Sequence, residues 1–302
     1  KVAPGLTSGT YTKQLIITSF TNHVPTTATF LPGQQFMVKL RSVNPNYDTD
    51  VFRRSQTAPP NIAAAVIMST NDSAYPIYVW YDAAQKTILW WSEADISYAN
   101  EDASQMFMGI NFKNSHNVQL LDLRGINTSR TKNMRFMFTE QYQHVKHIDL
   151  SEFDTSQAEN MRYMFSDQTH SYGAIYIVPD LRDFSKFNTK NVKDMSYMFS
   201  HSSLPSIDIR HFDTSNVTYM ESMFSDLKNV TSLDLSNLNT RRVVNMSNMF
   251  LSSKSLVSLN ISNWKNDSCT NMSFMFSDLE SLTDLNIYGF TTQNVTNMTS
   301  MF

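Results

Sequence analysis

The sequence predicts a repeat protein of the α+β class: a solenoid with one parallel sheet, short helical turns opposite it, and a small β-rich module in front. A Met-x-x-Met-Phe pattern recurs seven times between Met134 and Phe302, and these copies hold 14 of the 18 methionines. Their closing phenylalanines lie 27, 34, 25, 26, 26 and 26 positions apart. Strand-like apolar patterns separate the copies. A nearly fixed period in this range is typical of stacked units that bury their apolar edges against one another.

The composition excludes several classes of function. A net charge of −3 and a charged fraction of 17% argue against nucleic acid as a partner. The seven glycines form neither a dinucleotide-binding fingerprint nor a phosphate-binding loop. The sequence contains no apolar run of membrane-spanning length and no visible signal peptide, so we expect no membrane insertion. We expect the chain to be a fragment of a longer protein.

Residues 1–74 carry no repeat and predict the β-rich N-terminal module. Their apolar runs, at 15–20, 35–40 and 62–68, are separated by turns rich in Thr, Asn and Pro. The third run is equally compatible with a buried helix, because periodicity does not decide the structure of short apolar runs.

Residues 75–107 predict an aromatic hairpin that caps the solenoid at its N-terminal end. Two runs rich in β-forming residues flank a polar turn at 82–86, and a degenerate first unit follows, closing at Phe107. The aromatic side chains of the hairpin also fit a carbohydrate-binding platform. We favour the cap, because the open core of the first unit must be covered. This interpretation assigns both Trp80 and Trp90 to packing.

Residues 108–302 form the leucine-rich-repeat-like array. In the unit 229–250, Leu233 and Leu235 follow an L-x-x-L-x-L spacing that places both on one face of a short strand. In the preceding unit Val217, Met220 and Met223 recur every third residue, which predicts a short helix capped by the residues 213–215. We interpret the Met and Phe columns as core, and the lone Cys269, which falls in a column of small apolar residues, as buried.

One outward column of the predicted sheet is acidic. It provides a surface for a basic partner or for cations, although aspartate also simply solvates an exposed sheet face. An insertion at 169–178, which contains Tyr172, emerges near this face or is a neutral surface excursion. The column consists of Asp122, Asp149, Asp183, Asp208 and Asp234, followed by Asn260 and Asn286. The candidate ligand-binding residues are Asp149, Asp183, Asp208, Asp234 and Tyr172.

The repeat motif is more specific than a general leucine-rich pattern. FDTSNV-x-x-M-x-x-MF followed by L-x-x-LDLS resembles the BspA-like leucine-rich-repeat surface proteins of host-associated bacteria, over about residues 100 to 302. The segment PIYVWYDAAQKTILWWSEAD is similar to the one that commonly precedes such arrays. The resemblance implies an extracellular solenoid on the bacterial cell surface, used mainly for adhesion, with no shared catalytic residues.

These observations favour a non-enzymatic protein. The sequence contains neither a nucleophile elbow nor a zinc-protease motif, and its closest histidine pair, His144 and His147, flanks a predicted strand. We therefore expect no catalysis, no cofactor and no metal. Two functions remain open. The chain is either an adhesin whose repeats bind a host matrix protein, mucin, or another cell-surface protein or glycan, or a spacer that holds a binding module at 1–74 away from the cell wall.

Overall fold

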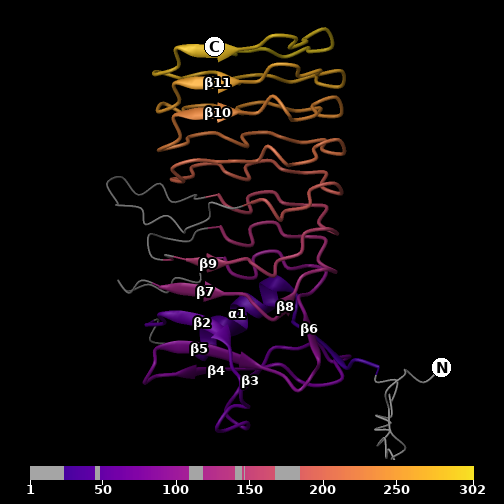
Figure 1. Cartoon of the computed structure of the whole chain (residues 1–302), viewed down its shortest axis with the longest axis vertical. Helices are drawn as coiled ribbons and strands as arrows, with labels where there is room; N and C mark the ends of the chain where they lie inside the picture. Colours follow the sequence, from indigo (N-terminus) through magenta and orange to yellow (C-terminus); the bar gives the residue numbers. More distant parts are fainter. Residues whose placement is uncertain (1–23, 45–47, 109–117, 140–144, 146, 167–183) are drawn as a thin grey trace, which may run out of the picture.

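The computed structural model describes residues 24–44, 48–108, 118–139, 145, 147–166 and 184–302. This part of the chain is mostly β, with short parallel sheets and one assigned helix, α1 (Gly33–Val43). Successive repeat units lie one above another along the long axis of the molecule, and the C-terminal end lies far from α1 (Figure 1).

The strands of the described residues form three sheets. The largest has the order β3-β4-β5-β2-β7-β9; β4 pairs antiparallel with β3 and β5, and the other neighbours are parallel. Its strands are β3 (Val66–Ile67), β4 (Tyr78–Asp82), β5 (Thr87–Trp91), β2 (Val51–Arg54), β7 (Leu120–Asp122) and β9 (Ile148–Asp149). The two three-stranded parallel sheets are β1 (Thr27–Thr29), β6 (Ile96–Tyr98) and β8 (Ile126–Asn127), and β10 (Ser232–Asp234), β11 (Ser258–Asn260) and β12 (Asp284–Asn286).

The N-terminal segment differs from the prediction in one element. The run 35–40, predicted to be a strand, lies within α1. Its buried residues, Gly33, Phe36, Met37 and Leu40, lie at helical spacing, so the periodicity did carry the signal. The run 62–68 contributes a strand only at its end, as β3, and the run 15–20 lies outside the described residues.

The strand β2 lies between the hairpin and the first repeat strand. Phe52 is in parallel register with Ile88 of β5 on one side and with Leu121 of β7 on the other. All three side chains are fully buried. One sheet and one core therefore join residues from before the hairpin, from the hairpin and from the repeats.

The predicted hairpin is present as β4 and β5. Trp80 pairs with Leu89, and the Asp82 carboxylate accepts hydrogen bonds from the backbone N–H groups of the turn. The two tryptophans face opposite ways. Trp90 is fully buried, with its ring 5.2 Å from that of Phe30 in an edge-to-face contact, whereas Trp80 is half-buried.

The predicted short helices of the repeats are wrong, because the Met-x-x-Met-Phe segments are consecutive tight turns. In the unit that ends at Phe224, the Met223 N–H donates to the Met220 carbonyl, and Ser222 has a φ of +52°. This left-handed conformation interrupts any α-helix. It recurs at the equivalent positions Gln105, Phe136, Tyr163, Tyr197, Asn248, Phe274 and Ser300.

Alternate backbone N–H groups of these turns bond to the next unit rather than within their own turn. The N–H groups of Met220, Ser222 and Phe224 donate to carbonyls of the following unit at 2.9–3.2 Å. A three-residue spacing of apolar side chains fits such turns as well as it fits a helix. Parallel bridges link eight units. They lie at Asp102 in the degenerate first unit and at the residue before the first methionine in the others: Asn133, Asn160, Asp194, Tyr219, Asn245, Asn271 and Asn297.

The Met and Phe columns form the core of the array, as predicted. The twelve methionines of the first six copies are fully buried. The closing phenylalanines, from Phe107 to Phe302, stack ring on ring with centroids 5.2–6.0 Å apart. Cys269 is also fully buried, and burial raises the pKa of its thiol. These columns therefore hold the units together.

The residues predicted to cap helices instead connect units. The buried Thr214 hydroxyl donates to the Asn239 carbonyl of the next unit at 3.0 Å and accepts the Asn239 N–H at 2.8 Å. The Asp213 carboxylate accepts the Ser215 N–H at 3.0 Å within its own turn. The same threonine pattern occurs at Thr128 and Thr155. The threonine of the recurrent Asp-Thr-Ser motif thus forms contacts between neighbouring repeat units.

We expect Thr214→Val to destabilise the array by about 1–3 kcal/mol, because it removes both hydrogen bonds between the buried Thr214 hydroxyl and the backbone of Asn239. Thr218→Val is the matched control, since the half-buried Thr218 side chain makes no hydrogen bond to the described residues. Urea unfolding of both variants measures the difference. Equal losses would contradict a specific role for the threonine column.

Candidate functional site

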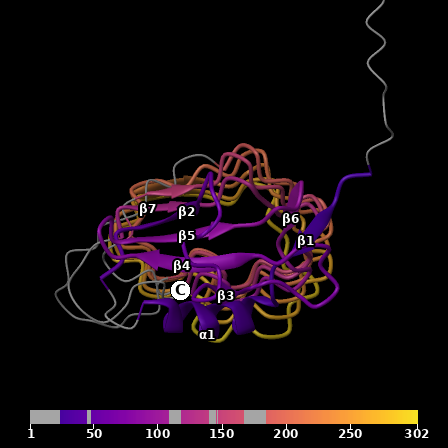
Figure 2. The same ribbon diagram turned by 90° about the horizontal axis from the view of Figure 1, so that it is seen from below.

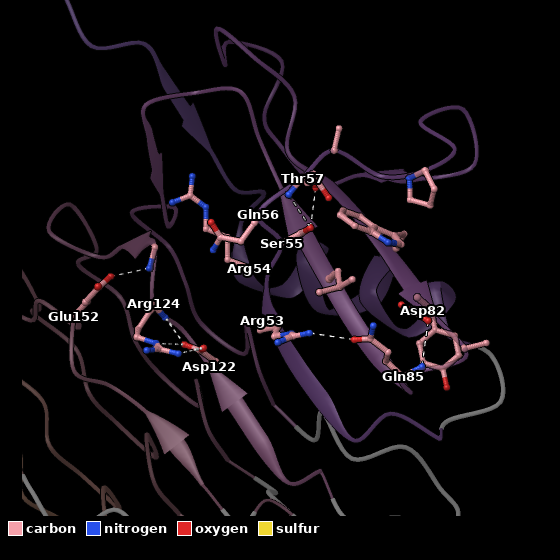
Figure 3. Close-up of a pocket in the computed structure, with 17 residues that line it drawn as sticks. Arg53, Arg54, Ser55, Gln56, Thr57, Asp82, Gln85, Asp122, Arg124 and Glu152 are labelled. Atoms are coloured by element: carbon pink, nitrogen blue, oxygen red, sulfur yellow. Dashed lines mark hydrogen bonds and ion pairs between the residues drawn. The ribbon is translucent and has the colours of Figure 1, made fainter.

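A groove of about 1080 Å³ lies on the outward face of the six-stranded sheet, near its N-terminal end. Strands β4, β5, β2 and β7 form its floor, and the loop 55–60 forms one wall. Figure 3 shows Glu152, Arg124 and Asp122 on one side, Asp82 and Gln85 on the other, and Arg53 and Arg54 between them. The lining residues are Arg53, Arg54, Ser55, Gln56, Thr57, Ala58, Pro60, Trp80, Tyr81, Asp82, Ala83, Gln85, Leu89, Asp122, Arg124, Gly125 and Glu152.

The charges on the repeat side of the groove are paired. Arg124 donates to both Asp122 oxygens, at 2.9 and 2.6 Å, and its Nε lies 3.2 Å from Asp149. The hydrogen bonds that Arg124 donates to Asp122 raise the pKa of Arg124 above its ordinary value. The Glu152 carboxylate accepts the Gly125 N–H at 2.8 Å. These groups form a fixed polar wall.

The two central arginines carry no such partner. Arg53 donates to the Gln85 amide oxygen at 3.1 Å, and the Arg54 guanidinium lies 5.2 Å from the centre of the Trp90 ring. Both side chains are exposed, and neither forms an ion pair with the described residues. Gly125 leaves room for Arg54, because a Cβ there would lie 2.8 Å from the Arg54 Cδ. Two guanidinium groups therefore remain available to a ligand.

Two aromatic side chains complete the groove. Trp80 is half-buried and lines the floor. The Tyr81 hydroxyl donates to Asp48 at 2.7 Å, and burial together with this hydrogen bond raises the pKa of Tyr81. Tyr81 is thus fixed in place. Trp80 offers a flat apolar surface among amides, hydroxyls and charges.

The predicted acidic column exists, but most of its oxygens are engaged. Asp149, Asp208 and Asp234 each accept a hydrogen bond from the backbone N–H two residues later, at 3.0–3.2 Å. Asp122, the first member, is buried and lines the groove. The predicted Asp183 and Tyr172, and the insertion that contains Tyr172, lie outside the described residues. The column therefore adjoins the groove at one end.

Arginines offset the repulsion along this column. Arg210 donates to both oxygens of Asp208, at 2.9 and 2.6 Å, and the hydrogen bond from Arg210 lowers the pKa of Asp208 to about 2. Burial works to raise the pKa of Asp149, but hydrogen bonds from Ser151 and the charge of Arg124 bring it below its ordinary value. The column is thus less acidic toward a partner than its aspartates alone suggest.

We expect Arg210→Gln to raise the pKa of Asp208 from about 2 toward its ordinary value of 3.8. The depressed pKa means that Asp208 contributes stability above pH 4, and that this contribution is lost as the pH falls from about 4 to about 2. Asp208 is half-exposed, so the effect on unfolding is small. An NMR titration of the carboxyl carbon measures the midpoint, and an unchanged midpoint in the variant would refute the pairing.

The sequence pointed to one part of the groove only, through the hairpin aromatics that also fit a carbohydrate-binding platform. Its cationic, amide and aromatic residues come from β2, the hairpin and the first repeats, which are separated by tens of positions. A second local signal is the pair Arg53-Arg54, which follows Val51 and Phe52. The arginine two positions after an aspartate, at Arg124 and Arg210, was also a readable signal, because such residues share a face of a strand.

The described part of the chain contains no cluster of three or more His, Cys, Asp or Glu side chains arranged to hold a metal ion. Of the predicted histidine pair, His147 is exposed, and His144 lies outside the described residues. Within the same described ranges, no helix has the length and apolar character needed to cross a bilayer.

Comparison with known proteins identifies the repeats. No curated protein and no solved structure gave a significant match. A family model described as "Mycoplasma protein of unknown function, DUF285" matches three times, over residues 101–229, 176–258 and 227–302. These matches span about two thirds of the chain and include every Met-x-x-Met-Phe copy. The chain therefore belongs to the DUF285 family.

Proposed function

We propose that this chain is a non-enzymatic binding protein that acts outside a bacterial cell and attaches to a glycan of a host or neighbouring cell through the groove. The observation that supports this most is the half-buried Trp80 on the groove floor, surrounded by amide, hydroxyl and guanidinium groups. Sugar rings present apolar C–H faces and a rim of hydroxyls. A flat aromatic surface with polar groups around it matches both features.

A protein ligand fits the groove less well. Stable protein interfaces are centred on apolar or aromatic anchors that enter well-packed pockets. Apart from the aromatics, the apolar lining is small: Leu89, Ala58, Ala83 and Pro60. The other lining residues are polar or charged, except Gly125, so they suit a ligand rich in hydroxyl groups.

The scaffold in this proposal is a solenoid related to the BspA-like surface proteins. The stacked phenylalanine column and the parallel bridges between units support it. A sheet supported by a continuous core holds the groove residues in fixed positions, which lowers the entropy lost on binding. Display on the cell surface follows from the resemblance alone and is part of the proposal.

A spacer function is the second candidate, favoured by the position of the groove. The groove lies at the end of the array where the hairpin packs, and the units from about residue 200 onward extend away from it (Figure 1). Those units would separate the groove from whatever lies beyond the other end of the stack. The two functions are compatible, because β2 and β7 place the groove across the boundary between the N-terminal segment and the repeats.

The test is a binding screen with the whole chain. Cutting the chain between residues 54 and 120 would separate β2 from β7, its neighbour in the sheet. The probes are glycan arrays, mucin and matrix proteins. Three variants locate the site: Trp80→Ala in the groove, Asp208→Lys with Asp234→Lys on the acidic column, and Tyr288→Ala as a control aromatic that is 78% exposed.

We expect glycan binding that is lost only in Trp80→Ala. Loss in the double aspartate variant alone would assign binding to the acidic column. A folded parent protein that binds no glycan would refute the proposed function, and binding only to proteins would refute the glycan assignment.

A further inference from the structure

The groove contains two positively charged side chains, Arg53 and Arg54, whose N–H donors are largely unused. Its carboxylates are engaged: Asp122 with Arg124, Glu152 with the Gly125 N–H, and Asp82 with the N–H groups of its own turn. Arg53 and Arg54 have no carboxylate partner among the described residues. An incoming anion therefore meets two guanidinium groups that have no carboxylate partner of their own.

These two guanidinium groups are held by neighbours that leave most of their donors exposed. The Gln85 amide takes one N–H of Arg53 at 3.1 Å. The Trp90 ring supports Arg54 from one side at 5.2 Å and accepts none of its in-plane hydrogen bonds. A guanidinium has five N–H donors in a planar fork that matches a carboxylate. Both arginines end strand β2, in register with Leu89 and Trp90, so their backbone positions are fixed by the sheet. As neighbours on a strand their side chains leave it on opposite sides, and both line the groove at the strand end.

From this arrangement we propose that the groove is selective for acidic oligosaccharides: Arg53 and Arg54, which both line it, each supply a positive charge to carboxylates of the ligand, while Trp80 supports a sugar ring. The inference rests on the proposed glycan-binding function and adds the class of sugar. A neutral glycan would leave the two arginines without a counter-charge. An acidic peptide would offer the carboxylate but no ring with a C–H face for Trp80.

The flanking carboxylates limit how much negative charge the ligand carries. Glu152 lies on one side of the arginines and Asp82 on the other (Figure 3). A polymer with sulfates on most residues would bring negative charge close to both. The groove therefore fits widely spaced carboxylates better than dense sulfates.

The probes that test this are a hyaluronan octasaccharide, which carries one carboxylate per disaccharide, the same oligosaccharide with its carboxyl groups reduced to alcohols, heparin, and poly-glutamate. Calorimetry with the whole chain at low and moderate salt measures each affinity. We expect hyaluronan to bind about 10-fold or more tightly than its reduced form, which corresponds to a charge-assisted hydrogen-bond pair. We also expect this preference to shrink as salt rises, and heparin to bind more weakly than hyaluronan.

The variant Arg53→Gln with Arg54→Gln should bring the ratio between the two hyaluronan forms close to one while the reduced form still binds. Arg41→Gln, which removes a charge from the exposed end of α1, is the control and should leave the ratio unchanged. Trp80→Ala should weaken both forms. Circular dichroism and melting temperatures establish that the variants are folded.

Three outcomes would overturn the inference. Equal binding of the two hyaluronan forms by the parent would leave a glycan-binding groove without acid selectivity. An unchanged ratio in the double arginine variant would place the selectivity elsewhere. Poly-glutamate that matches hyaluronan in affinity would make the groove an acidic-peptide site. Failure of every glycan in the screen would instead refute the proposed function itself.

Discussion

Met220→Ala is expected to destabilise the array by about 2–5 kcal/mol, because it opens a cavity in a close-packed column. Met220 is fully buried in a central unit, with units stacked on both sides. It belongs to the same buried core as the stacked rings of Phe199 and Phe224, whose centroids are 5.9 Å apart. The tight turns on both sides of Met220 are bonded to the neighbouring units, so they cannot collapse into the space.

The matched control is Met298→Ala in the last unit. Met298 occupies the same column but is 40% exposed, so its loss should lower stability by less than about 1 kcal/mol. Urea unfolding, followed by both far-ultraviolet circular dichroism and tryptophan fluorescence, gives the two values and shows whether the units unfold together. Losses of equal size at the two positions would contradict a core built by stacking.

The sequence predicted the positions of the apolar columns but not the backbone between them. Recurrent spacing identified Met220, Met223 and Phe224 as core, and all three are buried. The same spacing suggested a helix, whereas Ser222 has a positive φ. The reason is not a property of the local residues: alternate N–H groups of this segment bond to the next unit. Repeat contacts of this kind are visible only once the units are stacked.

The strand order could not be predicted. Local patterns identified the hairpin, and its tryptophans suggested both a cap and a sugar platform. Only the pairing of β2 between β5 and β7 shows that residues 51–54 lie beside the first repeat. This insertion creates the groove, because it brings Arg53 and Arg54 between Trp80 and Arg124. A site assembled from three separate segments has no characteristic residue spacing in the sequence.

The positions of the aspartates in the acidic column were predicted correctly, but the net charge of the column was overestimated. Strand alternation correctly placed Asp208 and Asp234 on an exposed face. The expectation of an acidic surface counted the aspartates alone and left out the residue two positions later. Arg210 pairs with Asp208 at 2.6 Å, and Ser236 donates to Asp234 at 2.7 Å. In the acidic column each described carboxylate therefore accepts hydrogen bonds from the turn that follows it, and at Asp208 the arginine also supplies a counter-charge.

The two tryptophans of the hairpin should respond to mutation in opposite ways. Trp90→Ala is expected to lower stability by about 3–5 kcal/mol, because a large, fully buried ring is lost from the core shared by β5, Phe30 and the end of β2. Trp90→Phe should cost much less. It keeps an aromatic ring in place and removes an indole N–H that has no hydrogen-bond partner in the described part of the chain.

Trp80→Ala, by contrast, should change the free energy of unfolding by less than about 1 kcal/mol and still abolish glycan binding. The half-buried Trp80 faces the groove, across the sheet from the core that holds Trp90. Denaturant unfolding and calorimetry on the same preparations separate the two effects. If Trp80→Ala unfolds as easily as Trp90→Ala, the hairpin acts only as a cap, as its place beside the first unit suggested. If Trp80→Ala keeps both stability and glycan affinity, the groove is not the binding site, and the acidic column becomes the surface to test.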